Sequence, residues 1–110
     1  MKQRSRKIKG RRLSKYVRKK ILKAFPHLKA KDILEATDGQ NGPDLILSKV
    51  AKKLVPFNWE LKSQERMATV YKWFAQASKN TKEIPVVVCK MNSREPLAIL
   101  DFDSFIDLIK

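Results

Sequence analysis

Three residues have the types and spacing to act together in chemistry. Asp44 follows the Gly42-Pro43 turn, and Glu60 and Lys62 lie two positions apart. Pro43-Asp44 is the only Pro-Asp pair of the chain, and Glu60-Leu61-Lys62 is its only acid-x-Lys triplet. Fifteen residues separate Asp44 from Glu60, which is enough for one strand, an excursion and a return strand. Two adjacent strands would bring both carboxylates together.

Such a pair of carboxylates suits a divalent cation, because the two negative charges repel each other unless a cation lies between them. Mg²⁺, with Mn²⁺ as a substitute, prefers hard oxygen ligands and keeps waters that can be activated for attack on phosphorus. Strand alternation places Lys62 on the same face as Glu60, where it would orient or deprotonate the attacking water. We therefore predict Asp44 and Glu60 as metal ligands, the Leu61 carbonyl as a candidate third ligand, and Lys62 as catalytic. The alternatives are a turn residue for Asp44 and a solvated strand face for Glu60 and Lys62.

The elements that must position these residues follow from hydrophobic spacing and turn residues. Residues 31–37 suit a short helix or a strand, and a strand is favoured. The predicted elements are helices over 11–25, 64–80 and 101–109, strands over 31–37, 44–48, 57–62, 84–90 and 96–100, and a basic helical turn over 49–55. The order αβββαββα predicts the α/β (α+β) class, with a mixed sheet of about five strands flanked by helices.

The predicted core takes the apolar face of each helix, together with the buried strands. Its helix residues are Leu13, Tyr16, Val17, Ile21 and Ala24, then Met67, Val70, Tyr71, Phe74 and Ala77, then Phe105, Ile106 and Ile109. The β-branched run over 84–90 is typical of a central strand and makes Cys89 a core residue. Asp101 or Asp103 would cap the last helix. We expect a basic arm over 1–10, disordered when alone, and a single domain over 11–110.

The positive charge is concentrated at the start of the chain. The 110 residues carry 25 Lys and Arg against 11 Asp and Glu, a net charge of +14. Residues 1–31 hold fourteen of the basic residues and no acid, so the remainder is neutral. This asymmetry predicts a polyanionic partner, nucleic acid first and an anionic membrane second. The basic segment lacks the aromatic and leucine anchors of membrane-binding helices, which disfavours the membrane.

Several classes of protein are excluded. No apolar run approaches the ~20 residues needed to span a bilayer, and no apolar core follows the basic N-terminus as in a signal peptide. The single Cys89 cannot form an internal disulfide, and no Cys/His cluster suits zinc. We expect a soluble protein of the reducing cytoplasm.

Basic residues in two regions are candidates for DNA contact. They are Arg4, Arg6, Lys7, Lys9, Arg11, Arg12 and Lys15 in the arm and first helix, and Lys49, Lys52 and Lys53 between the two site strands. Their affinity would come from phosphate contacts and fall with salt. No base-reading motif is present, so recognition of DNA shape is favoured over sequence readout.

The Asp44 and Glu60-Leu61-Lys62 constellation resembles the PD-(D/E)XK nuclease superfamily, whose core has the order αβββαβ. Further matching segments are Gly10-Arg11-Arg12-Leu13, Phe25-Pro26, Gly42 to Ser48, Trp59 to Lys62 and Gln76-Ala77. These segments are similar to small phage-encoded nucleases of the superfamily described as Holliday junction resolvases. The resemblance implies a restriction-endonuclease-like fold, Mg²⁺-dependent cleavage of branched DNA, a symmetric dimer, and the host cytoplasm if a phage encodes the chain.

The chain departs from the superfamily pattern at one position. Many members carry a further metal-binding acid on the first helix, whereas residues 1–31 contain none. Either Glu35 completes the site, with Asp32 and Asp38 as weaker candidates, or water or a partner subunit supplies that ligand. Gln76 resembles a helix glutamine that holds a water or phosphate in some members, and its alternative is a polar surface residue.

The leading interpretation is a structure-selective, Mg²⁺-dependent endonuclease that resolves four-way junctions by paired nicks. A four-way junction has two-fold symmetry and needs two cuts, so a homodimer with two sites is expected. One alternative is a nicking or restriction-like nuclease of the same fold acting on duplex or flap DNA. Another is a non-catalytic nucleic-acid-binding protein whose basic segment is the whole function.

Overall fold

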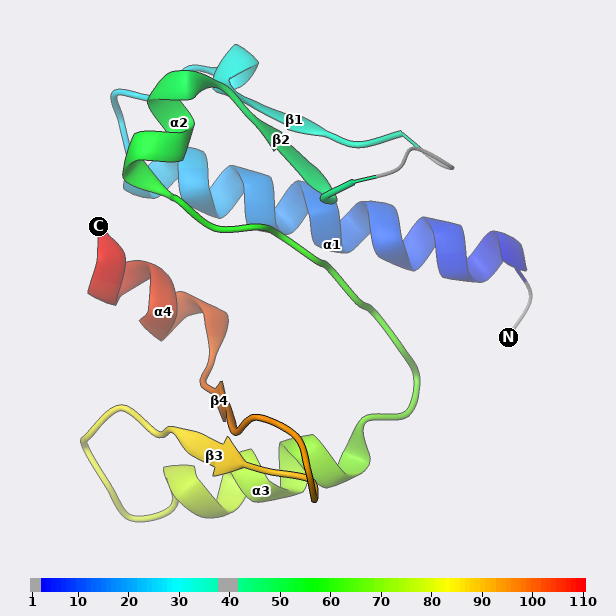
Figure 1. Cartoon of the computed structure of the whole chain (residues 1–110), viewed down its shortest axis with the longest axis vertical. Coiled ribbons are helices and arrows are strands. Elements are labelled where there is room, and N and C mark those ends of the chain that lie inside the picture. The colour runs from blue at the N-terminus through cyan, green and yellow to red at the C-terminus, as the bar shows by residue number, and fades with distance from the viewer. Residues whose placement is uncertain (1–2, 38–41) are drawn as a thin grey trace. The chain divides into compact units, whose positions relative to one another are not determined.

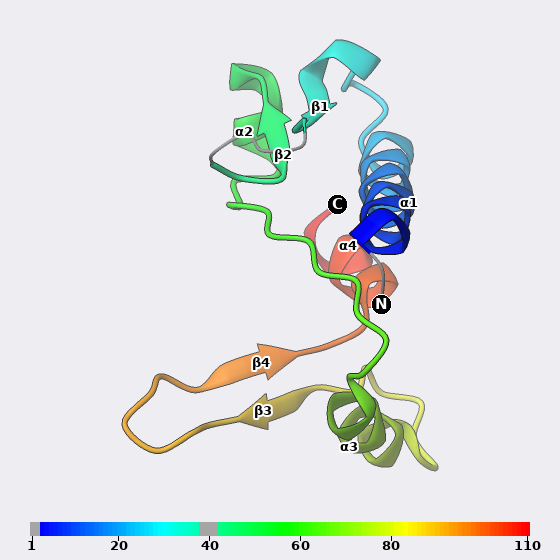
Figure 2. The same ribbon diagram turned by 90° about the vertical axis from the view of Figure 1, so that its right-hand side faces the viewer.

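The structure is a computed structural model that describes residues 3–37 and 42–110, with the backbone alone for residues 3–10. The chain forms two compact units (Figures 1 and 2). One takes the chain up to Gln64 together with Ile109 and Lys110, and the other covers Glu65–Leu108. The expected single domain over 11–110 stays a prediction. None of the described helices is long and apolar enough to cross a membrane.

The first unit packs one long helix against a small antiparallel sheet (Figure 1). α1 (Gln3–Ala24) lies along β1 (Ile33–Glu35), and β1 pairs with β2 (Leu45–Leu47). The 3-10 turn η1 (Ala30–Asp32) precedes β1, and α2 (Lys49–Leu54) follows β2. The buried apolar residues of this unit are Val17, Ile21, Phe25, Leu28, Ile33, Leu45, Ala51, Val55 and Trp59. The predicted strands at 31–37 and 44–48 and the helical turn at 49–55 are confirmed, in shorter form.

α1 begins eight residues earlier than the sequence analysis predicts. Residues 3–10 continue the helix instead of forming a separate arm, because Gln, Lys and Arg are good helix formers and one Gly costs only about 1 kcal/mol. The helix ends at Ala24, one residue before the predicted end at 25, and Pro26 disfavours its continuation. Val17 and Ile21 are buried, but Tyr16 is 46% exposed, so its assignment to the core was wrong. Tyr16 lies about 100° around the helix from Val17, at the edge of the apolar stripe.

A buried carboxylate connects the start of β1 to the start of α2. Asp32 is 8% exposed, and its Oδ2 accepts from the Lys29 N–H (2.7 Å) while its Oδ1 accepts from the Ser48 hydroxyl (2.7 Å). These hydrogen bonds stabilise the ionised form and hold the pKa of Asp32 below its usual range. Ser48 Oγ also accepts from the Ala51 N–H (3.1 Å), so Ser48 is the N-cap of α2 as well as a strand-end residue.

Residues 57–62 are extended but do not form the predicted third strand. Asp44 donates its N–H to the Trp59 carbonyl (2.8 Å), whereas its own carbonyl accepts from the Ala36 N–H (3.0 Å). In a regular strand the N–H and C=O of one residue face the same neighbouring strand. At Asp44 they face different segments, so the backbone bends there. The pairing with β1 and the pairing with the 57–62 segment both stop at this residue. The predicted alternation is largely confirmed, since Trp59 is buried and Glu60 is exposed, but Phe57 is 38% exposed.

The second unit contains a helix, a two-stranded hairpin and a C-terminal helix (Figure 2). α3 (Ala68–Ser78) packs on β3 (Val87–Cys89), which pairs antiparallel with β4 (Leu97–Ile99) in the register Val87↔Ile99. α4 (Phe102–Ile109) follows, and the Asp101 carboxylate accepts from the Ser104 N–H (2.9 Å) at its start. Asp101 therefore caps α4, one of the two predicted choices, and this hydrogen bond lowers the pKa of Asp101.

Four expectations for the second unit were wrong. The helix begins at Ala68 instead of 64, and Tyr71 is 69% exposed because the half-buried stripe of α3 runs through Met67, Val70, Phe74 and Ala77. The run 84–90 contributes only three residues to a strand, and that strand has one partner instead of two. Val88 is consequently 70% exposed and Cys89 is half-buried, so neither lies in a sheet interior.

The mixed helix-and-strand class is confirmed, but the single sheet is not. The described residues contain two separate two-stranded antiparallel sheets, β1-β2 and β3-β4, where one mixed sheet of about five strands was predicted. The physical reason is that strand pairing needs a partner backbone, which the hydrophobic pattern of one segment does not specify.

Candidate active site

Asp44 occupies the junction of three backbone segments in the first unit. The turn before it is made possible by Gly42, whose φ of +104° favours glycine. Its backbone links to Ala36 on one side and to Trp59 on the other, at 3.0 and 2.8 Å. The two segments that carry the predicted metal ligands are therefore neighbours, as the spacing predicted.

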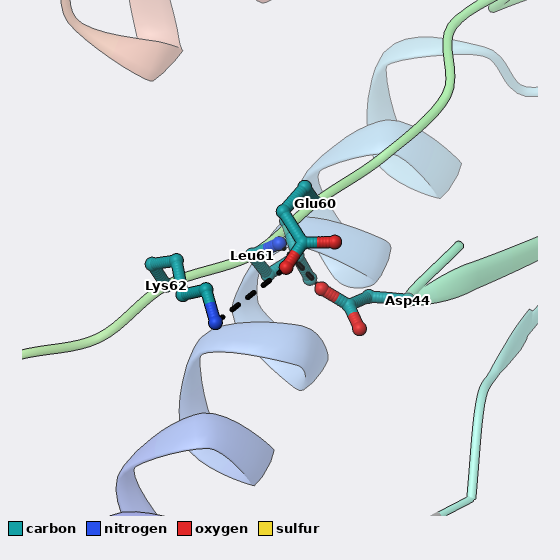
Figure 3. Close-up of polar contacts among 4 residues, drawn as sticks. All are labelled: Asp44, Glu60, Leu61 and Lys62. Carbon is teal, nitrogen blue, oxygen red and sulfur yellow. Dashed lines mark hydrogen bonds and ion pairs between the residues drawn. The ribbon is translucent and has the colours of Figure 1, made fainter. Parts of the chain in front are cut away.

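The Asp44 carboxylate binds the backbone of the acid-x-Lys triplet directly. Its Oδ2 accepts a hydrogen bond from the Leu61 N–H at 2.6 Å (Figure 3). A carboxylate that accepts from a backbone N–H makes a short, charge-assisted hydrogen bond. In a regular sheet the Leu61 N–H would donate to a backbone carbonyl of the neighbouring strand. Here the side chain of Asp44 takes the place of that carbonyl and holds the 59–62 segment.

Glu60 and Lys62 lie on the solvent side of this segment. Glu60 precedes Leu61, the residue whose N–H binds the Asp44 carboxylate (Figure 3). Lys62 Nζ lies 3.6 Å from Glu60 Oε1, and the two side chains are 66% and 65% exposed, respectively. An exposed ion pair of this kind adds little stability, about 0–1 kcal/mol. The stability of the fold therefore does not explain why Glu60 and Lys62 lie beside each other.

The donor set fits Mg²⁺ chemically. Asp44 uses Oδ2 for the Leu61 N–H, which leaves Oδ1 to bind a cation, and the Glu60 carboxylate is open to solvent. Mg²⁺ typically takes one or two carboxylates and keeps several waters, so two acids are sufficient. The described residues contain no group of three or more Asp, Glu, His or Cys side chains placed to hold a metal. Among the described residues, a further protein ligand would be a backbone carbonyl such as that of Leu61.

Glu35 is not brought together with this pair. It ends β1 opposite Leu45, whose side chain is buried, so Glu35 lies half-buried on the core side of the sheet. Asp32 is committed to Lys29 and Ser48, and Asp38 lies outside the described residues. The third acid of the superfamily pattern therefore has no counterpart among the described residues.

Gln76 belongs to α3 of the second unit and is exposed. Its predicted contact with the active site stays a prediction.

The candidate DNA-binding residues lie on exposed faces wherever their side chains are described. Arg11, Arg12 and Lys15 are exposed on α1, and Lys49, Lys52 and Lys53 are exposed on α2. Lys52 also lines a pocket together with Pro43 and Asn58. Pro43 directly precedes Asp44 in the sequence, and Asn58 directly precedes Trp59. The side chains of Arg4, Arg6, Lys7 and Lys9 lie outside the described residues.

The sequence reasoning missed the N-cap at Ser48 and the alignment of two further lysines on α1, both of which simple signals would have found. Ser48 stands directly before a helical turn, which is the usual position of an N-cap. Lys19 and Lys23 continue the four-residue spacing of Arg11 and Lys15, which places them on the same helix face.

No protein-family model matches the chain, and no curated protein or solved structure has significant similarity to it.

Proposed function

We propose that this chain is an Mg²⁺-dependent DNA endonuclease selective for branched DNA, with a four-way junction as its leading substrate. The observation that carries the proposal is the hydrogen bond between Asp44 Oδ2 and the Leu61 N–H, because it joins the two acid-bearing segments at 2.6 Å. The exposed Lys62 beside Glu60 adds the third member of the constellation. The resemblance to the PD-(D/E)XK superfamily supplies the reaction class.

Each residue has a defined role in the proposed reaction. Asp44 Oδ1 and the Glu60 carboxylate would hold Mg²⁺, which when bound lowers the pKa of its waters and offsets charge on the phosphate. Lys62 would orient the attacking water and stabilise the additional negative charge at phosphorus. The Leu61 N–H keeps the Asp44 carboxylate in place, and both acids would then act on the same phosphate.

Selectivity for branched DNA rests on the distribution of charge and on symmetry. The fourteen basic residues of segment 1–31 suit a phosphate backbone and carry no motif for reading bases. A dimer would present two sites to the two symmetric cuts of a junction.

Asp44→Asn is the decisive variant, because the amide oxygen can still accept from the Leu61 N–H while the charge needed for the metal is lost. We expect cleavage of a four-way junction with Mg²⁺ to fall by at least about 100-fold, with DNA binding retained. Glu60→Gln should lose cleavage in the same way. The control is Glu83→Gln, which changes an exposed acid of the second unit and should cleave the junction at the wild-type rate. Unchanged Mg²⁺-dependent cleavage by Asp44→Asn would refute the site.

Comparing substrates distinguishes the alternatives. Equal cleavage rates on a four-way junction and on its linear arms would instead favour a nicking or restriction-like nuclease on duplex or flap DNA. Binding with no cleavage under any divalent metal would favour a non-catalytic DNA-binding protein, which the charged first segment could support alone.

A further inference from the structure

The exposed side of α1 carries basic residues at every fourth position. Arg11, Lys15, Lys19 and Lys23 are all exposed and lie in one row along the helix. With 100° per residue, Lys15 and Lys19 lie about 160° from Val17, and Arg11 and Lys23 lie about 120° from it. The middle of the row is therefore opposite the buried Val17. We call these four residues the α1 basic row.

The fold uses another cation of the same helix, which provides an internal comparison. Arg18 is half-buried, and its guanidinium donates to the carbonyls of Ile33 (2.6 Å) and Ala30 (2.7 Å). Arg18 thereby connects α1 to the segment that contains η1 and β1. Lys15, Lys19 and Lys23 are exposed, in contrast to the half-buried Arg18.

The row has an energetic cost in the free protein. Arg11, Lys15, Lys19 and Lys23 form three successive like-charge pairs at spacing i,i+4, each destabilising by about 0.2–0.5 kcal/mol. Residues 1–31 contain no acid, so no intrahelical partner relieves the repulsion. A locally unfavourable pattern without a packing role is typical of a binding surface.

We propose that the α1 basic row follows the phosphate backbone of one strand of duplex DNA. The four positions span about 18 Å at 1.5 Å per residue, and a B-DNA strand offers one phosphate per about 3.4 Å of helix axis. The row therefore matches a length of backbone with at least four phosphates. This inference rests on the proposed function for its choice of ligand, and it adds Lys19 and Lys23 to the DNA-binding surface.

The test is the salt dependence of binding to a 20-base-pair duplex, measured with chelator so that no cleavage occurs. Each lost phosphate contact lowers the slope of log K against log salt by about 0.9, so K15Q/K19Q/K23Q should lower it by about 2.7. Between 50 and 200 mM salt, the wild-type chain should then lose roughly 40-fold more affinity than the variant. Gln is a good helix former and removes the repulsion, so the free variant should melt no lower than the wild type.

The matched control is K72Q/K79Q/K82Q, which removes three exposed lysines of the second unit and changes the net charge equally. This control should retain the wild-type slope, as should the charge-conserving K15R/K19R/K23R. If both glutamine triple variants lowered the slope equally, or if neither lowered it, the proposal that the α1 basic row binds phosphates would be wrong. Tighter binding to vesicles of anionic lipid than to the duplex would overturn the choice of ligand.

The two proposals fail separately. If Asp44→Asn abolishes cleavage while K15Q/K19Q/K23Q keeps the wild-type slope, the nuclease stands and the row is wrong. If no variant or metal gives cleavage but the slope falls as expected, the row stands and the nuclease is wrong.

Discussion

Asp44 has two separable roles at the scale of single residues. Its charge belongs to the candidate metal site, and its Oδ2 holds the Leu61 N–H at 2.6 Å. The first role needs an anion, whereas the second needs only an oxygen acceptor. Asn and Ala at this position therefore test different things.

Asp44→Ala should lower the free energy of unfolding by about 1–2 kcal/mol, because the Leu61 N–H loses its acceptor. Asp44→Asn should cost less than about 1 kcal/mol, since its amide oxygen accepts from the same N–H. Urea unfolding of both variants gives these values. Equal stability of the two variants would show that the hydrogen bond contributes nothing.

Asp32 predicts an acid-sensitive first unit. Its folded-state pKa is lowered by the Lys29 N–H and the Ser48 hydroxyl, so its stabilisation is complete above the ordinary value of 3.8 and is lost as pH falls through the lower folded pKa. Thermal melts from pH 7 to pH 2 should show Asp32→Asn less stable than wild type at pH 7. The difference should shrink below about pH 4. A constant difference across this range would contradict the assignment, and Glu83→Gln is the control.

At the scale of elements, the first unit depends on the contact between α1 and β1. Ile33 and Ile21 are fully buried there, while Leu34, the next residue of β1, is 49% exposed. The burial within β1 alternates as a one-sided sheet requires.

Ile33→Ala should lower the free energy of unfolding by about 2–5 kcal/mol, because it leaves a cavity in the core. Leu34→Ala should change it by about 0.5 kcal/mol, since a half-exposed side chain loses little burial. Chemical denaturation followed by tryptophan fluorescence can report both, because Trp59 lies buried in the same unit. Similar losses for the two variants would contradict the assignment of the buried face.

At the scale of the whole molecule, net charge and symmetry lead to a stoichiometry. A net charge of +14 on 110 residues favours association with a polyanion and opposes close approach of two free chains. We therefore expect DNA to promote dimer formation.

Sedimentation of the chain with a four-way junction, with chelator present, should give two chains per junction, and the two nicks should appear as a symmetric pair once Mg²⁺ is added. The linear arms of the junction are the control and should give no preferred pair. One chain per junction with single, unpaired nicks would contradict the dimer.

The sequence determined those features that depend on local pattern and side-chain chemistry. The net charge lies in residues 1–31. The strands around Ile33 and Leu45, the cap at Asp101 and the contact of Asp44 with the Glu60-Leu61-Lys62 segment could be predicted. Each rests on residue type, short-range periodicity or the length of chain between two segments.

Only the tertiary structure decided which predicted strands form and which acids lie on neighbouring segments. The bend at Asp44 stops the ladder at 57–62, and β3 has one partner, because hydrogen-bonding partners lie far away in sequence. The register opposite Leu45 places Glu35 on the core side of the sheet and away from the pair. A hydrophobic pattern says that a segment has a buried face, but the backbone that comes to lie beside it decides its hydrogen bonds and its neighbours.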